Sequence, residues 1–212
     1  MLKEKALKVV SRLKKEYPAT RTFLNFKNPL QLLVATILSA QCTDRQVNLV
    51  TSQLFRKYRS LKDYARADLN KLRREVHSTG LFRNKARNIL MAAKKILDDF
   101  NGKVPDSLDK LVQLPGVARK TANIVLYNAF GKVEGIAVDT HVSRLSQRLE
   151  LSDNQNRDKI EKDLMCLLPQ KEWGCLNHLL VQHGREICRS RKPKCLQCVL
   201  KSICPGKKAF FF

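Results

Sequence analysis

Residues 114–122 read Leu114-Pro115-Gly116-Val117-Ala118-Arg119-Lys120-Thr121-Ala122 and lie between two stretches of helical periodicity. The Pro-Gly pair predicts a tight turn, because glycine adopts backbone conformations that other residues avoid. The helix that follows begins with unpaired N–H groups and the positive end of its dipole, which together favour an anion such as a DNA phosphate. An isolated Leu-Pro-Gly is more simply explained as a turn between helices. The choice between this turn and an anion site therefore depends on the other motifs in the sequence.

Helical periodicity extends in both directions from this turn. The predicted helices cover approximately residues 1–17, 29–40, 43–58, 68–77, 83–100, 107–112, 119–130, 139–149, 155–168 and 173–187. We see no convincing strand, repeat or low-complexity tract. The sequence therefore predicts an all-α fold of about ten helices. Gly131 and Gly135 interrupt the pattern and indicate a boundary between two closely packed halves, with a cleft between them as the natural place for a site.

The charge of the chain points to a polyanionic partner. Its 212 residues include 41 Lys plus Arg against 19 Asp plus Glu, a formal net charge of +22. Hydrophobic residues make up 43%, which excludes a disordered chain, and no apolar run is long enough to span a membrane. Nucleic acid or an acidic membrane surface is the expected partner, and the alternative is a charged surface that maintains solubility.

Seven cysteines, an odd number, and the lack of a signal peptide favour a reducing cytoplasm over a secreted disulfide scaffold. Cys42, Cys166 and Cys175 lie in helical stretches, where we expect each to be a small buried hydrophobic residue.

The other four cysteines are crowded near the C-terminus with the spacing Cys188-x6-Cys195-x2-Cys198-x5-Cys204. Zinc sites usually use two close pairs of cysteines, whereas this segment has one pair and two single residues. The spacing favours an iron–sulfur cluster, while zinc, disulfides and free thiols remain alternatives. Arg191, Lys192 and Lys194 occupy the loop between the first two cysteines, where a metal would fix them as phosphate contacts. A structural role for the metal is therefore favoured over a redox role.

Together these segments resemble the endonuclease III family of helix–hairpin–helix DNA glycosylases. The resemblance rests on the cysteine spacing and on four ordered motifs, which are Leu38-Ser39-Ala40-Gln41-Cys42-Thr43-Asp44, Ser78-Thr79-Gly80-Leu81, the hairpin from Leu114 to Asn123, and Val138-Asp139-Thr140-His141. It covers essentially all of residues 29–204. Ala118 departs from the family pattern, which often has a second glycine at this position, and its methyl group could crowd a phosphate.

The resemblance implies a two-domain architecture and a cofactor. Residues 20–132 would form a helical barrel domain that contains the hairpin. Residues 1–19 and 133–212 would form an iron–sulfur cluster domain. A [4Fe-4S] cluster would be bound by Cys188, Cys195, Cys198 and Cys204, with the active site in the cleft between the domains.

The resemblance also makes Lys120 the catalytic nucleophile and Asp139 the catalytic carboxylate. A glycosylase must extrude the damaged nucleotide, because its glycosidic carbon cannot be reached inside a stacked duplex. A lysine amine can attack that carbon, expel the base and leave a Schiff base, from which β-elimination cleaves the strand. A phosphate-binding lysine is the alternative for Lys120. Asp139 also has the position of an ordinary helix cap, and the two roles are compatible.

Several further residues are expected to contact DNA. Gln41 and Leu81 correspond to family residues that fill the gap left by the extruded nucleotide, and core packing is the alternative for Leu81. Gly116, Ala118 and Arg119 would bind phosphate at the hairpin. Asp44 is either a pocket residue or a helix cap, and we assign no chemistry to His141.

The resulting prediction is a bifunctional DNA glycosylase and AP lyase of base excision repair that acts on oxidised pyrimidines. Its expected partner is double-stranded DNA that contains damaged pyrimidines or abasic sites. We expect a monomer with no membrane association, located in the cytoplasm at the nucleoid. A monofunctional adenine-mismatch glycosylase is disfavoured by the presence of Lys120 and by the lack of an acidic residue in residues 29–40. A non-enzymatic DNA-binding module is the third alternative.

Overall fold

The computed structural model describes residues 1–206, and all the regular secondary structure in that range is helical, which confirms the predicted all-α class. The α-helices are α1 (Leu2–Glu16), α2 (Pro29–Leu38), α3 (Asp44–Lys57), α4 (Leu61–Ala65), α5 (Leu69–Glu75), α6 (Phe82–Asp99), α7 (Leu108–Leu111), α8 (Arg119–Phe130), α9 (Thr140–Arg148), α10 (Arg157–Leu167) and α11 (Gln170–Glu186). Two 3₁₀ turns, η1 (His77–Thr79) and η2 (Cys195–Gln197), complete them. Residues 207–212, which end the predicted second domain, lie outside the described residues.

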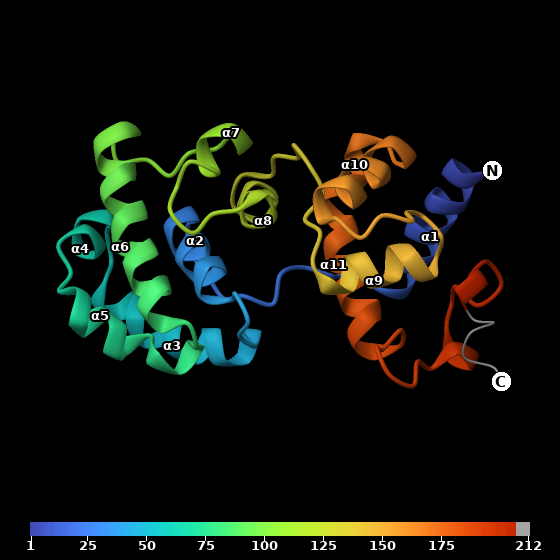
Figure 1. Cartoon of the computed structure of the whole chain (residues 1–212), viewed down its shortest axis with the longest axis horizontal. Coiled ribbons are helices and arrows are strands. Elements are labelled where there is room, and N and C mark those ends of the chain that lie inside the picture. Colours follow the sequence, from blue (N-terminus) through green and yellow to red (C-terminus); the bar gives the residue numbers. More distant parts are fainter. Residues whose placement is uncertain (207–212) are drawn as a thin grey trace. The chain divides into compact units, whose positions relative to one another are not determined.

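The chain divides into two compact units (Figure 1). Unit 2 is the continuous segment Phe23–Lys132. Unit 1 joins Met1–Thr22 to the chain from Val133 onward, so it combines both ends of the sequence. The helical barrel and cluster functions that the sequence suggests for these regions remain predictions.

Unit 2 is built around α2, whose seven consecutive residues 32–38 are all buried. Asn28 caps this helix by accepting a hydrogen bond from the N–H of Gln31, and Pro29 occupies its first turn, where a missing N–H costs nothing. The helix contacts α3, α6 and α8, and Figure 1 shows it between α6 and α8. A helix that is apolar on every side must be surrounded in this way. Its C-terminal end therefore starts from a fixed position.

Unit 1 packs the first helix of the chain against one of the last. Helix α1 contacts α10 and α11, and it buries Ala6, Val9 and Leu13 completely. The apolar face of α1 therefore lies in the core of unit 1, although Leu2 at its start is 43% exposed. No helix in residues 1–206 is long and apolar enough to cross a lipid bilayer.

One prediction about the isolated cysteines is wrong. Cys166 is exposed rather than buried, because it lies on the outward face of the amphipathic helix α10. Cys42 and Cys175 are half-buried.

Candidate functional site

The predicted hairpin connects α7 to α8 and is anchored by two buried apolar side chains, Leu114 and Val117. The N–H of Val117 donates to the carbonyl of Leu114 at 3.1 Å and closes the turn. Gly116 has a φ of +79°, and a Cβ atom there would lie 2.7 Å from Nδ2 and 2.9 Å from Cβ of Asn88. The turn therefore requires glycine for both its backbone conformation and its close approach to α6.

Ala118 does not strain the hairpin. It is the N-cap residue of α8, with an extended backbone at φ −86° and ψ 169°, and its side chain is exposed. Any L-residue adopts this conformation, so the turn itself does not need a second glycine here. Because alanine has no side-chain acceptor, it leaves the N-terminus of α8 without a side-chain cap.

Lys120 is in the first turn of α8, directly after the hairpin, and its side chain is half-buried. Arg119 precedes it and is exposed. Both residues belong to unit 2, whereas Asp139 belongs to unit 1. The N-terminal position that the sequence predicted for Lys120 is thus present in the structure.

Asp139 caps α9, as its sequence position suggested. Its Oδ1 atom accepts hydrogen bonds from the N–H groups of His141 at 2.9 Å and Val142 at 2.8 Å. Its Oδ2 atom lies 3.4 Å from Nδ1 of His141, so the sequence analysis missed a neighbour of this carboxylate. The sequence contained a signal for this contact. His141 follows Asp139 by two residues, and the residue two positions after an N-cap lies beside the capping side chain. The two main-chain bonds hold the carboxylate in one orientation.

Gln41 and Leu81 are both exposed and share an unusual backbone conformation. Their φ angles are +52° and +47°, in the left-handed region that non-glycine residues rarely occupy. Gln41 lies three residues beyond the end of α2, and Leu81 separates η1 from α6. The Leu81 side chain is 53% exposed, so the alternative that it packs in the core is wrong. Asp44 is the first residue of α3, which Thr43 caps.

Lys85 of α6 was missed by the sequence analysis. It is only 3% exposed, and its Nζ atom donates to the carbonyl oxygens of Leu38 at 2.8 Å and Thr79 at 2.7 Å. Burial lowers the pKa of its ammonium group. The signal was available, because Lys85 occupies the same helical stripe as the buried residues Ile89 and Ile96.

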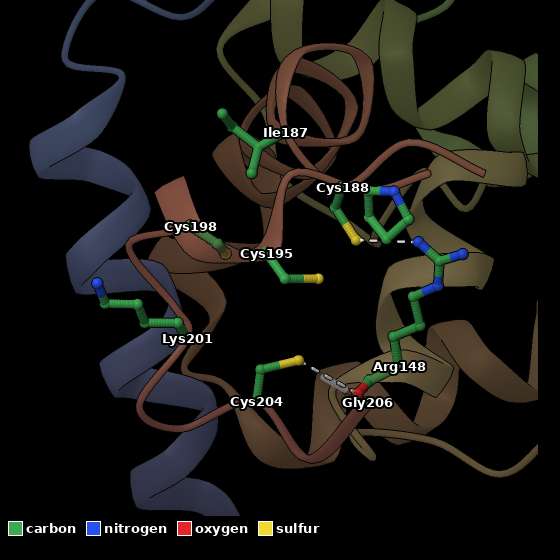
Figure 2. Close-up of a pocket in the computed structure, with 9 residues that line it drawn as sticks. Arg148, Ile187, Cys188, Cys195, Cys198, Lys201, Cys204 and Gly206 are labelled. Carbon is green, nitrogen blue, oxygen red and sulfur yellow. Dashed lines mark hydrogen bonds between the residues drawn. The ribbon is translucent and has the colours of Figure 1, made fainter. Parts of the chain in front are cut away.

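The four clustered cysteines line one partly open pocket, together with Arg148 and Ile187. Figure 2 shows the sulfur atoms of Cys188, Cys195 and Cys204 pointing toward a common open space beside Arg148. Within residues 1–206, no three His, Cys, Asp or Glu side chains converge closely enough to bind a single metal ion. The four thiols line this pocket together, which fits the four-thiolate ligand set of an iron–sulfur cluster.

Side chains from distant parts of unit 1 surround these sulfur atoms. Arg148 donates to Sγ of Cys188 at 3.3 Å and to the carbonyl of Arg189 at 2.7 Å. Nε2 of His183 lies 3.3 Å from Sγ of Cys198, and its Nδ1 lies 3.1 Å from the hydroxyl of Tyr17. Burial lowers the pKa of His183 to about 4, so its imidazole is neutral at neutral pH. Hydrogen bonds of this kind orient metal ligands in known centres.

Burial raises the pKa of the Cys198 thiol to about 11. This sulfur therefore becomes a thiolate only where a metal displaces its proton. The basic residues predicted for phosphate contact, Arg191, Lys192 and Lys194, are all exposed on the same loop. They are available to a polyanion, as the sequence analysis expected.

Comparisons with known proteins agree on one group of relatives. Residues 34–170 match the family described as "HhH-GPD superfamily base excision DNA repair protein". The protein named Endonuclease III from Synechocystis sp. is 49% identical over 207 residues, which cover 98% of this chain and 94% of that protein. Endonuclease III from Escherichia coli K12 is 36% identical over 208 residues, with 98% of each chain covered.

Solved structures give the same result. A structure described as "Structure of a Trapped Endonuclease III-DNA Covalent Intermediate: Estranged-Adenine Complex" has a TM-score of 0.93 and 43% identity, with 98% of each chain covered. A thermostable thymine-DNA glycosylase at 24% identity has a TM-score of 0.87 over 97% of this chain and 98% of that one, which shows a shared fold.

Proposed function

Because the chain belongs to the endonuclease III family of DNA glycosylases and AP lyases, we propose that it removes oxidised pyrimidines and cleaves the strand 3′ to the resulting abasic site. The observation that carries this proposal is the placement of Lys120. A half-buried lysine follows a glycine-dependent turn directly, at the N-terminal end of a helix. A purely DNA-binding hairpin needs the turn and the helix end but no partly buried amine.

In the proposed reaction, Nζ of Lys120 attacks C1′ of the extruded nucleotide. A bond forms between Nζ and C1′, the bond between C1′ and the base breaks, and its electron pair leaves with the base. The attached nitrogen gives one proton to the departing base and the other to O4′ as the C1′–O4′ bond breaks, so the ring opens and an imine joins the lysine to C1′. Loss of a proton from C2′ expels the 3′ phosphate, which is the β-elimination step. A covalent intermediate is named for the related enzyme in its trapped DNA complex.

Asp139 is proposed to stabilise the positive charge that develops on the sugar. The two main-chain hydrogen bonds to Oδ1 fix the carboxylate and leave Oδ2 oriented beside His141. A pre-oriented charge needs little reorganisation during the reaction, which is how fixed electrostatic groups lower a barrier. We propose His141 as a neighbour that keeps Oδ2 in place.

The DNA contacts are proposed at three surfaces. Gly116, Ala118 and Arg119 present the N-terminal end of α8 to a phosphate. Gln41 and Leu81, the wedge residues, enter the duplex and fill the space that the extruded nucleotide leaves. The basic loop, Arg191 to Lys194, contacts further phosphates.

We propose that Cys188, Cys195, Cys198 and Cys204 bind a [4Fe-4S] cluster. The bound cluster would crosslink the four cysteine thiolates and so hold the basic loop in place. Arg148 and His183 contact two of the four sulfur atoms and would orient them. We further propose that the protein acts as a monomer at the nucleoid of the cytoplasm.

The proposal is tested with duplexes that carry an oxidised pyrimidine, an oxidised purine, uracil or an abasic site. We expect base release and strand scission on the oxidised pyrimidine, and scission alone on the abasic duplex. Base release without scission would contradict the lyase mechanism. Preference for the oxidised purine would contradict the substrate class.

A further inference from the structure

The wedge residues Gln41 and Leu81 sit in two loops that are far apart in sequence and both strained. Each has a left-handed backbone, which is sterically strained for any residue other than glycine. Strain of this kind persists only where the surroundings enforce it, and it often occurs at functional sites. The structure must therefore contain groups that hold both loops.

Lys85 contacts the main chain of both loops. Its acceptors are the carbonyl of Leu38, three residues before Gln41, and the carbonyl of Thr79, two residues before Leu81. These carbonyls end α2 and η1, where helix carbonyls lack partners within the helix. One buried ammonium group thus satisfies two helix ends at once and joins residues that are about 40 positions apart.

A plain stabilising role does not explain this choice of residue. Both acceptors of the buried ammonium are main-chain carbonyls rather than carboxylates. Removing a charged group from water costs more than two neutral acceptors return, and an apolar residue would fit the stripe formed with Ile89. What only a long cationic side chain provides is a fixed link between the two carbonyls.

A second link between the same regions lies at the surface. Nε2 of Gln46, in α3, donates to Oγ of Ser78 at 2.8 Å. The N–H of Cys42 donates to the carbonyl of Ser39 at 3.1 Å and closes the turn before α3. The bond between Gln46 and Ser78 is exposed, so water competes with it, whereas the Lys85 bonds are buried.

We propose that Lys85 is a positioning residue that sets the separation of the Gln41 and Leu81 loops, so that both side chains enter the duplex as one rigid pair. The inference rests on the wedge role proposed above. It concerns the step of nucleotide extrusion and assigns Lys85 no contact with DNA.

The test compares Lys85→Met with Lys94→Met, which removes the same charge from an exposed position of the same helix. For each protein, the scission rate on a duplex with an oxidised pyrimidine is divided by the rate on single-stranded abasic DNA. The single strand needs no extrusion, so this ratio corrects for the fraction of folded enzyme. We expect the ratio to fall roughly 10- to 100-fold in Lys85→Met, as for other misplacements of about 1 Å. Lys94→Met should keep the wild-type ratio.

Leu81→Ala in the same assay separates this inference from the proposed function. If Leu81→Ala leaves the ratio unchanged, the wedge role itself is wrong. If Leu81→Ala lowers the ratio and folded Lys85→Met does not, the positioning role is wrong. In the double variant Lys85→Met/Leu81→Ala, the ratio should fall no further than in the more affected single variant, because both changes disable the same pair of wedge residues. Should Lys85→Met fail to fold, Lys85→Arg keeps the charge but alters the reach, and a wild-type ratio in it would overturn the inference.

Discussion

The hairpin around Gly116 and the cysteine segment from Cys188 to Cys204 differ in how many side chains from distant parts of the sequence hydrogen-bond to them. The hairpin around Gly116 is closed by its own main chain and anchored by buried side chains next to it in sequence. The cysteine segment from Cys188 to Cys204 has turns closed by its own main chain, but side chains from far along the chain hold it as well. Arg12 donates to the carbonyl of Val199 at 3.1 Å, and Arg148 donates to Cys188 and to the residues after it.

The two loops therefore need different interactions in order to form. A hairpin of local contacts forms whenever its two helices pack. A segment whose only regular structure is a 3₁₀ turn depends on crosslinks, and four thiols around one pocket supply the place for them. We therefore expect the cysteine loop, but not the hairpin, to depend on a metal cofactor.

The largest expected effect comes from removing one thiol of the pocket. In Cys198→Ser, we expect the protein to lose most of its iron and its visible absorbance, because one of four ligands is gone. Limited proteolysis should then cut residues 189–197 rapidly while the hairpin stays resistant. Cys166→Ser, which changes an exposed cysteine away from the pocket, is the control and should keep its iron. Equal iron content in both variants would contradict the expectation that the cysteine loop depends on a metal cofactor.

Asp139 of unit 1 is a second feature built from contacts that are close in sequence, because it caps α9 through the N–H groups of His141 and Val142. Asp139→Asn keeps a capping oxygen, so its unfolding free energy should stay within a few tenths of a kcal/mol of wild type, whereas Asp139→Ala should lose about 1 kcal/mol. Both should release base roughly 100-fold more slowly, because both lack the charge. Denaturant unfolding and single-turnover kinetics measure the two effects. Full activity in Asp139→Asn would restrict the residue to capping.

The hairpin itself is tested by Gly116→Ala. We expect a loss of about 2 kcal/mol in unfolding free energy, from the positive φ and from the clash with Asn88, together with weaker DNA binding. Gly131→Ala is the matched control, because Gly131 has a φ of +65° with no atom within 4 Å of its added Cβ. It should lose about 1 kcal/mol and bind DNA normally. Equal losses in the two variants would show that the approach to α6 does not matter.

Features of local origin could be predicted from the sequence. Helical periodicity predicted most helices to within a few residues, and the aspartate at position 139 indicated a cap that the structure contains. The first-turn position of Lys120 followed from Pro115 and Gly116, five and four residues before it. These features depend on residues close in sequence.

Features that depend on distant packing could not be predicted. Lys85 bridges two loops only because α2 ends beside it, with Leu38 47 positions away. Arg148 and Cys188 are separated by 40 positions, and no spacing rule relates them. The exposure of Cys166 depended on which face of α10 packs inward, which periodicity alone left ambiguous.

The smallest expected effect concerns the surface charges of the basic loop. If Arg191, Lys192 or Lys194 pairs with a phosphate, its replacement by glutamine should reduce the slope of log binding constant against log salt by about one. Lys162→Gln, an exposed change on α10, should leave the slope unchanged. Fluorescence titration across a range of salt concentrations measures the slope. If the loop variants behave like Lys162→Gln, the cysteine loop does not touch DNA.

Lys120 is proposed to form a covalent bond with the opened sugar. Borohydride added during turnover reduces an imine and traps the enzyme on DNA. We expect trapped adduct with the wild type and with Lys110→Gln, an exposed lysine of the neighbouring helix α7, and no adduct with folded Lys120→Gln. An adduct of undiminished yield in Lys120→Gln would contradict the account.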